Sequence, residues 1–535
     1  MRRNIAYIGS VALAVLVSAC LTGCVNEQLA SGDEEWVKPS DTDTYITFNL
    51  DLSDGDTRAV TSEGQDGDEF EYGSDNEERI DDITFFLFRI NSWDAQDNAP
   101  CLYKGHLDPS NCVEWKGTGK DVSMTFRLKG YTPGTDDRVI VVANGGDRFD
   151  NLSTLGQVRL MAGYEAWRKG TTLAECDKFV ITSAYNDSDN GKIEFAGKAG
   201  TKADPYISGV RVQRVAARID FMYDPARNVT GSAPYNSFDY QVNKVPGDES
   251  TELLARLHIV NIIPYNVKQT SSFLIRQVTA QGDIYGTGGV LYGGHEYKDD
   301  KGIPANYVLE PHTLSKGLQD DLVAWYGDTR ASAVFGNPAG YLTGTAISDY
   351  SRDVREESGD IFVTVAYANE NTQTQAHYSE RYVTGILLRA IYVPLRVYSD
   401  AAATVASAVD FSAGHTFWRF VPSFSSQTES ECVYFDNAAA ANAYKASVAG
   451  GGEVACYPDG VCYYKVWIRH ASVARTLNVT YPMEYAIVRN NVYRVSVDCV
   501  TGPGTPSPDE PDTDNATTRI YVRKWNCRTQ PTIRL

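Results

Sequence analysis

Apolar segments of strand length recur along the whole chain. Tyr45–Leu52 alternates without error, so that Ile46, Phe48, Leu50 and Leu52 share one face. Such alternation predicts a half-buried β-strand. Clusters of Gly, Asn and Asp separate the segments, as hairpins and Greek-key connections require. Further strands are predicted at residues 83–90, 138–144, 210–223, 253–263, 390–398, 417–421, 462–468 and 493–500. The pattern therefore predicts an all-β protein.

The length of the chain sets the number of β-sandwiches. A chain of 535 residues with 42% hydrophobic residues can bury more than one core. Short, evenly spaced strands make the sandwich the expected architecture. We expect an N-terminal sandwich over residues 59–275, which includes the strands at 210–223 and 253–263, and a C-terminal one over 276–500. The one helix predicted in the N-terminal part covers Val158–Lys169.

The N-terminus carries the layout of a bacterial lipoprotein. Two arginines precede an apolar run over residues 5–19, and the tetrapeptide Leu21–Cys24 follows it. The run is too short to span a bilayer, so residues 1–23 are predicted to be a secretory signal peptide. Cys24 is the predicted lipidation site. Val17–Cys20 fits the same pattern less well, because cleavage there leaves a second cysteine and a shorter apolar core.

A cleavable loop follows the first predicted strand. Arg58 and the small residue Ala59 come directly after the turn-rich stretch Ser53–Thr57. An exposed arginine in a flexible loop is a site for a trypsin-like protease. The same arginine also fits an ordinary solvated charge, and the residues alone leave both interpretations open. If the site is cut, residues 24–58 form a lipidated propeptide that contains the strand.

The C-terminus is predicted to be a strand on a tether. Thr501–Pro508 is rich in Pro and Gly, and an acidic stretch runs from there to Asn515. Because proline removes backbone donors and like charges repel, we expect this piece to be a linker and not part of a core. The next segment alternates again, with one face formed by Thr518, Ile520 and Val522, and Trp525 extends it.

The sequence carries no recognisable catalytic or metal-binding pattern. Gly286–Gly294 lacks the order of a phosphate-binding loop, and the pair His295–Glu296 lacks a second histidine at metalloprotease spacing. Asn186–Gly191 starts like a calcium loop but has no glutamate at its twelfth position, so it predicts a turn. We expect no enzyme activity, no metal and no cofactor. The formal net charge of −20 argues against a nucleic-acid partner.

Eight cysteines follow Cys24, an even number that permits disulfides in an exported chain. Cys101 with Cys112, or Cys456 with Cys462, could close hairpin-sized loops, but the connectivity cannot be deduced from the sequence.

Several short motifs, in order along nearly the whole mature length, resemble the major-subunit fimbrillins, the lipoprotein-derived type V pilins of Bacteroidales. The likeness is closest to the subunit of the short (minor) fimbriae. The matching positions are Leu21–Cys24, the strand Ile46–Leu52 ending at Thr57–Ala59, Ile80–Ile83, Val139–Asn144, Arg214–Arg218, Ile487–Tyr493, Thr501–Gly504 and Trp525. The stretch from about Thr345 to Gln375 and the loop at residues 438–452 match nothing in the family.

The resemblance implies two tandem transthyretin-like β-sandwiches and a structural role. The chain would travel through the periplasm to the outer membrane on the Cys24 lipid. An arginine-specific protease would then cut between Arg58 and Ala59. Residues 501–535 would act as linker and donor strand, with Thr518, Ile520, Val522 and Trp525 entering the next subunit where Ile46, Phe48, Leu50 and Leu52 had been. The implied partners are further copies of the chain, the protease, and the anchor and tip subunits of the fimbrium.

Two alternatives to a shaft subunit stay open. The first is a glycan-binding lipoprotein of the outer membrane, suggested by Trp418, Tyr463, Tyr464 and Trp467, because sugars stack on exposed aromatic rings. Aromatic residues in alternating strands more often fill sandwich cores. The second is an anchor or tip subunit of the same fimbrium. An anchor would keep its lipid, and a tip would not need a donor strand.

Overall fold

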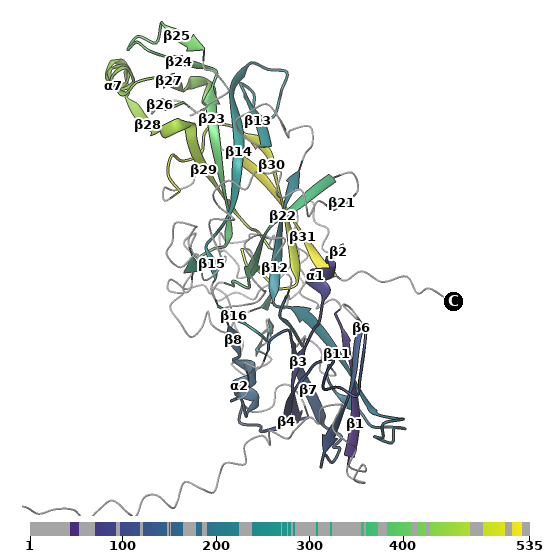
Figure 1. Cartoon of the computed structure of the whole chain (residues 1–535). Coiled ribbons are helices and arrows are strands. Elements are labelled where there is room, and N and C mark those ends of the chain that lie inside the picture. Colours follow the sequence, from purple (N-terminus) through teal and green to yellow (C-terminus); the bar gives the residue numbers. More distant parts are fainter. Residues whose placement is uncertain are drawn as a thin grey trace, which may run out of the picture.

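The computed structural model shows an elongated molecule built mostly of β-strands in several sheets (Figure 1). It has a lower body, an upper body and a small tip on the upper body. In the described part of the chain, no helix has both the length and the apolar character needed to cross a membrane. The described residues are 43–52, 70–91, 97–117, 121–146, 149, 151–163, 178–183, 190–223, 238–268, 270–274, 277–279, 282–283, 307–308, 322–323, 355–357, 360–372, 382–408, 415–423, 428–470, 485–508 and 516–526.

The lower body is a continuous sheet that folds around one core. Its strand order is β4-β3-β7-β9-β11-β1-β6-β5, and β10 pairs with β11 off this path. β11 joins the two halves, because its end, Val212–Arg214, pairs with β9 and its earlier part pairs with β1. The strands are β1 (Asp43–Asp51), β3 (Ile83–Arg89), β4 (Cys101–Leu107), β5 (Glu114–Lys116), β6 (Asp121–Lys129), β7 (Asp137–Ala143), β9 (Ile181–Ser183), β10 (Ile193–Glu194) and β11 (Tyr206–Arg214).

The upper body packs a six-stranded sheet against a four-stranded one. The six-stranded order is β2 (Phe70–Tyr72), β31 (Ala516–Asn526), β30 (Asn491–Val500), β12 (Ala216–Tyr223), β22 (Asp360–Asn369) and β21 (Arg355–Glu357). The four-stranded order is β13 (Phe238–Asn243), β14 (Leu253–Tyr265), β23 (Gly385–Pro394) and β29 (Val461–Trp467). Buried residues of both sheets form one core, among them Ile219 of β12 and Ile259 of β14.

The strands at residues 216–223 and 253–265 correct the sequence-based assignment. We expected both to continue the N-terminal sheets, but β12 pairs with β22 and β30, and β14 pairs with β13 and β23. The change from the lower core to the upper one falls at Val215, between β11 and β12. Alternation shows that a segment is a strand, but not which sheet it joins.

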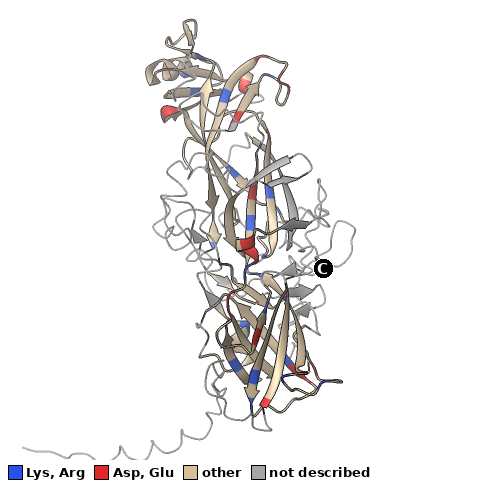
Figure 2. Ribbon diagram, turned by 45° about the vertical axis from the view of Figure 1, so that its right-hand side comes forward, with Lys and Arg blue, Asp and Glu red and all other residues tan. Residues whose placement is uncertain are grey.

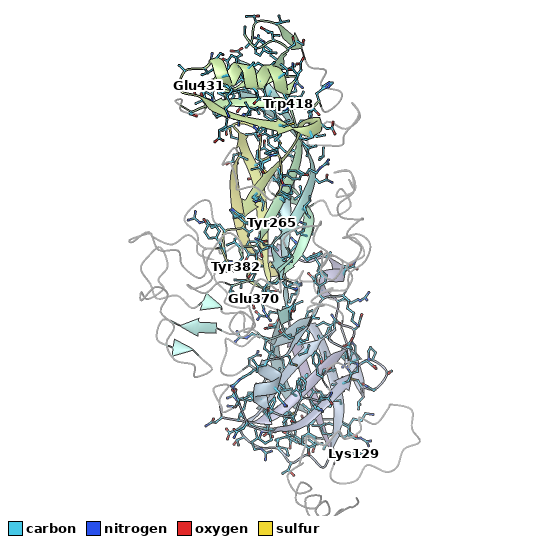
Figure 3. The ribbon with its side chains drawn as sticks, turned by 90° about the vertical axis from the view of Figure 1, so that its left-hand side faces the viewer. Lys129, Tyr265, Glu370, Tyr382, Trp418 and Glu431 are labelled. Atoms are coloured by element: carbon cyan, nitrogen blue, oxygen red, sulfur yellow. The ribbon has the colours of Figure 1, made fainter. Side chains whose placement is uncertain are left out.

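The tip is a five-stranded sheet covered by a helix. Its order is β25 (Ala406–Ala408), β24 (Arg396–Tyr398), β27 (Val433–Phe435), β26 (Phe417–Pro422) and β28 (Gly452–Tyr457). Helix α7 (Ala438–Ser447) begins at Asn437, whose side chain accepts a hydrogen bond from the Ala440 amide at 2.7 Å. Figure 3 shows Trp418 and Glu431 at this end of the molecule and Lys129 at the other.

Short elements complete the described structure. The predicted helix at Val158–Lys169 is only the single turn of α2, which ends at Arg159, and residues 164–169 lie outside the described part. The remaining elements are α1 (Asp75–Glu78), α2 (Leu155–Arg159), β8 (Ala162–Gly163), β15 (Val267–Lys268), β16 (Ser271–Ser272), β17 (Gln277–Thr279), β18 (Gly282–Asp283), β19 (Tyr307–Val308), β20 (Leu322–Val323), η4 (Glu429–Glu431) and η5 (Pro458–Gly460).

Buried charges join the two bodies. Arg218 of β12 binds Glu77 of α1 at 3.2 Å and Asp220 at 3.0 Å, and Tyr367 donates to Glu77 at 2.6 Å. The Arg218, Glu77 and Asp220 side chains are at most 1% exposed. Figure 2 shows charges of both signs on the central strands. Removing one partner would leave the other buried and unpaired, so such a network favours a single arrangement of the bodies.

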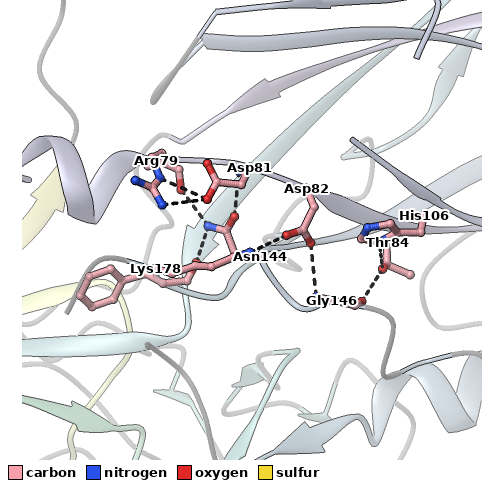
Figure 4. A network of polar contacts seen from close by, with 9 residues as sticks. Arg79, Asp81, Asp82, Thr84, His106, Asn144, Gly146 and Lys178 are labelled. Carbon is pink, nitrogen blue, oxygen red and sulfur yellow. Dashed lines mark hydrogen bonds and ion pairs between the residues drawn. The ribbon is translucent and has the colours of Figure 1, made fainter. Parts of the chain in front are cut away.

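A second polar network holds the start of β3 in the lower body (Figure 4). Asn144, with a φ of 56°, donates to the carbonyl of Arg79 at 2.7 Å and accepts from the Asp81 amide at 2.9 Å. Lys178 contacts Asp82 at 2.7 Å. The motifs at Ile80–Ile83 and Val139–Asn144, far apart in sequence, thus meet at one corner.

Candidate strand-exchange site

Strand β1 lies in the middle of the lower sheet, hydrogen-bonded on both sides. It runs parallel to β11, with Phe48 opposite Ser208, and antiparallel to β6, with Phe48 opposite Met124. The next chain segment in this sheet, β3, is four strands away in the sheet order. Removing β1 would therefore open a slot one strand wide, bounded by the unpaired edges of β6 and β11.

The inner face of β1 fills the centre of the lower core. Ile46 and Phe48 are fully buried, and Leu50 and Leu52 are at most 2% exposed. The ring of Phe48 packs edge-on against Phe126 and Phe85, at 4.7 Å and 5.5 Å between centroids. The predicted half-buried strand is confirmed.

The outer face of β1 carries polar contacts in addition to the buried side chain of Tyr45. The Thr47 hydroxyl hydrogen-bonds the Thr125 hydroxyl at 2.9 Å, and Asp43 accepts from Arg127 at 3.1 Å. Asn49 is exposed. The apolar face therefore supplies most of the burial that holds the strand.

We predict that Phe48→Ala lowers the free energy of unfolding of the precursor's lower body by about 3–5 kcal/mol, because it leaves a cavity among three packed rings. Chemical denaturation of the purified precursor measures the change. Asn49→Ala, on the exposed face of the same strand, is the control and should stay within about 0.5 kcal/mol of wild type. An unchanged midpoint for Phe48→Ala would show that the core does not depend on β1.

The C-terminal strand pairs with its own upper body in this single chain. β31 runs antiparallel to β30, with Ile520 opposite Val495 and Val522 opposite Tyr493. The short strand β2, which follows the predicted cleavage loop, runs parallel to Lys524–Asn526 at the end of β31. The side chains of residues 517–526 lie outside the described part. Any exchange must first release β31 from β30 and β2.

The Pro- and Gly-rich segment before β31 was predicted to be a linker outside any core. That prediction is wrong for the first part of the segment, residues 502–505, which is packed against the upper body. Gly502, Pro503, Gly504 and Thr505 are buried. Thr505 and Tyr463 exchange two backbone hydrogen bonds, at 2.8 Å and 2.9 Å, along the edge strand β29. Residues 506–515 separate this packed segment from β31, and residues 509–515 lie outside the described part.

Of the four aromatic residues considered for sugar stacking, Tyr464 is buried, and Trp418, Tyr463 and Trp467 are partly exposed. Tyr464 is 2% exposed and donates to the carbonyl of Gly502 at 2.7 Å. Trp467 packs on Tyr265 at 5.5 Å between centroids, Trp418 packs against the core of the tip and Tyr463 against the upper core. Because Tyr464 is buried, the four rings do not all belong to one exposed platform.

Several sequence predictions fall outside the described residues. These are Cys24, Arg58, Ala59, residues 286–294, and the pair His295–Glu296. Among the described residues, no group of His, Cys, Asp and Glu is arranged to hold a metal. Neither pair considered for a disulfide, Cys101 with Cys112 or Cys456 with Cys462, is joined by one in the structure.

The sequence did not reveal the buried arginines at the junction of the bodies. Arg214 and Arg489 are fully buried, and Arg489 binds Glu370 at 3.0 Å and the carbonyl of Phe273 at 2.6 Å. Arg214 donates to the carbonyl of Glu77 at 2.7 Å. Both lie in motifs that carried the family resemblance, Arg214–Arg218 and Ile487–Tyr493. The position of these arginines in the shared motifs was the signal that could have identified them as buried structural residues.

The position of β1 and the pairing of the C-terminal strand define a candidate site for strand exchange, and one family model matches part of the chain. Residues 455–530 match the family model described as major fimbrial subunit protein type IV, fimbrillin, C-terminal. The match bears out the predicted resemblance to fimbrillins over this C-terminal part of the chain. The closer likeness to short-fimbria subunits stays a prediction.

Solved structures of low identity were also found. A putative cell adhesion protein from Bacteroides eggerthii is 13% identical, with 90% of this chain and 96% of that chain covered and a TM-score of 0.33. A fimbrial assembly protein from Parabacteroides distasonis is 16% identical, with 50% and 85% covered and a TM-score of 0.23. A fimbrial protein from Bacteroides ovatus is 11% identical, with 50% and 42% covered and a TM-score of 0.18. No curated protein sequence matches the chain.

Proposed function

We propose that the protein is the shaft subunit of an adhesive surface fimbrium, and that it polymerises by exchange of β1 for the C-terminal strand of a neighbour. The position of β1 carries the proposal. It is a central strand with both edges paired, yet it is joined to the rest of the body only through residues 53–69, which contain Arg58. Cutting after Arg58 leaves β1 held by noncovalent contacts alone.

The C-terminal strand is a suitable replacement. β31 has 11 residues and β1 has 9, so one can fill the length of the other. Thr518, Ile520 and Val522 would lie where Ile46, Phe48 and Leu50 had been. Each large apolar side chain buried there contributes about 1.5–3 kcal/mol, and two strand ladders add to this.

The placement of the two ends favours exchange between chains. Strand β1 lies in the lower body and β29 in the upper body (Figure 1), and Thr505 is bridged to Tyr463 of β29. The ten residues 506–515 between Thr505 and β31 span at most about 36 Å. A contact between the upper body of one chain and the lower body of the next does not close on itself, so it builds a filament.

The remaining features complete the proposal. The two bodies would be tandem transthyretin-like sandwiches divided at Val215, and not at residue 275 as the sequence suggested. The precursor would reach the outer membrane on the Cys24 lipid, and an arginine-specific protease would release the mature chain. Further copies of the chain would form the shaft, and anchor and tip subunits would occupy its ends.

N-terminal sequencing of protein from assembled fibres tests this function. We expect the mature chain to begin at Ala59, because residues 24–58 leave with β1. A blocked N-terminus at Cys24 in the fibres would instead support an anchor subunit or a surface lipoprotein that keeps its lipid.

The lipid site has its own test. Cys24→Ser should leave unprocessed precursor short of the outer membrane, because the modified thiol is missing. Metabolic labelling with a fatty-acid analogue and membrane fractionation measure this, and Cys20→Ser is the matched control that should label normally. Labelling that persists in the Cys24→Ser chain would move the site elsewhere.

A further inference from the structure

The packed segment Thr501–Thr505 is built to hold its position. The hydroxyl of Tyr464 donates to the carbonyl of Gly502 at 2.7 Å, and that of Tyr457 donates to the carbonyl of Gly504 at 3.0 Å. Burial raises the pKa of both phenols, so both stay protonated and donate. Together with the Thr505–Tyr463 bridge, these bonds pair successive backbone groups of the segment.

Both glycines are required by close approach. A Cβ at Gly504 would lie 2.1 Å from the carbonyl oxygen of Tyr463, which is backbone and cannot turn away. A Cβ at Gly502 would lie 2.5 Å from the Glu429 carboxylate. The glycines therefore let the segment press against β29 and η4, and they do not serve flexibility.

A buried ion pair holds the carboxylate against which the segment Thr501–Thr505 packs. Arg419 of β26 donates to Glu429 at 2.6 Å, and Tyr392 of β23 donates to the other carboxylate oxygen at 2.9 Å. The Arg419 and Glu429 side chains are 10% and 4% exposed. Glu429 is thus fixed by two elements, and Gly502 packs onto it.

We propose that Thr501–Thr505 is a rigid mount that aims the C-terminal strand at the neighbouring subunit, with Gly504 and Glu429 as positioning residues of the exchange. The inference rests on the proposed function. A strand on a free linker would search a large volume, and the mount confines that search to the reach of residues 506–515. The mount also transmits tension on the inserted strand to β29, so that this tension does not pull β30 away from its sheet.

Gly504→Ala tests the mount, with Pro506→Ala, directly after the segment, as the control. Overpacking of this size should make the Thr505 amide exchange hydrogen at least about tenfold faster. Cleaved Gly504→Ala subunits should polymerise slower by a similar factor, while Pro506→Ala matches wild type. Unchanged exchange at Thr505, or faster exchange with polymerisation at the wild-type rate, would overturn the mount.

Binding of a synthetic peptide of residues 516–535 to cleaved subunits separates the two proposals. The mount predicts wild-type peptide affinity for Gly504→Ala, because the slot lies in the lower body. Failure of the peptide to bind even wild type would reject strand exchange itself, and the mount with it. If Gly504→Ala does not fold, Tyr464→Phe removes only the hydroxyl, and it should speed exchange and slow polymerisation by about fivefold.

Discussion

An Arg58→Ala chain is expected to accumulate as a folded, lipidated monomer and to form no fibres. With the loop intact, Ile46, Phe48, Leu50 and Leu52 stay in the lower core, and no slot opens for a neighbour. The covalent link keeps β1 at high effective concentration, so a competing strand from solution cannot displace it. Electron microscopy of cells and sedimentation of the purified protein measure the loss.

Arg396→Ala is the matched control for this variant. Arg396 is an exposed arginine in the tip, far along the chain from the loop. It should leave cleavage and fibre formation unchanged. Fibres of normal length from Arg58→Ala would show that the strand leaves by another cut, or that it never leaves.

Removing residues 509–535 should also abolish fibres, but at a later step. The slot of the lower body remains intact, so the shortened chain should be exported, cleaved and folded around β1 or an empty slot. Because β30 loses its partner β31, we expect the upper body to become less stable without unfolding at moderate temperature. Gel filtration of the cleaved chain should show monomers only.

Adding the missing strand in trans sharpens this prediction. A synthetic peptide of residues 509–535 should bind the cleaved, shortened chain and cap it, whereas the same peptide with Ile520→Asp and Val522→Asp should not. A shortened chain that is degraded and never recovered as folded protein would mean that β31 belongs only to its own upper body. Fibres built by the shortened chain would also rule out its role as donor.

Local patterns predicted strands well and their partners poorly. The alternation of Ile46, Phe48, Leu50 and Leu52 was enough to predict β1. A strand with one exposed and one buried face has polar and apolar residues at alternate positions. The same alternation gave β12 and β14 as strands but assigned them to the wrong body. Partner choice depends on contacts between residues more than a hundred positions apart, such as Ile219 with Ala366.

Glycine and proline misled the prediction at Thr501–Pro508. Their frequency usually marks a linker, but here glycine provides close packing against Tyr463 and Glu429. Helix α7 could have been predicted from the sequence, although residues 438–452 were expected to form a loop. Asn437 is a good N-cap, and the alanine-rich run that follows has high helix propensity. The buried pairs Arg218–Glu77 and Arg489–Glu370 join residues 141 and 119 positions apart, so no local pattern reveals them.

Disulfide trapping in assembled fibres tests strand exchange most directly. Ser208 lies opposite Phe48 on β11, is fully buried and has a side-chain oxygen without a hydrogen-bond partner, so Ser208→Cys is a small change. Combined with Ile520→Cys, it should yield ladders of covalent multimers on mild oxidation of fibres, and each single variant should yield none. Cross-links found only within single chains, with fibres intact, would contradict the account.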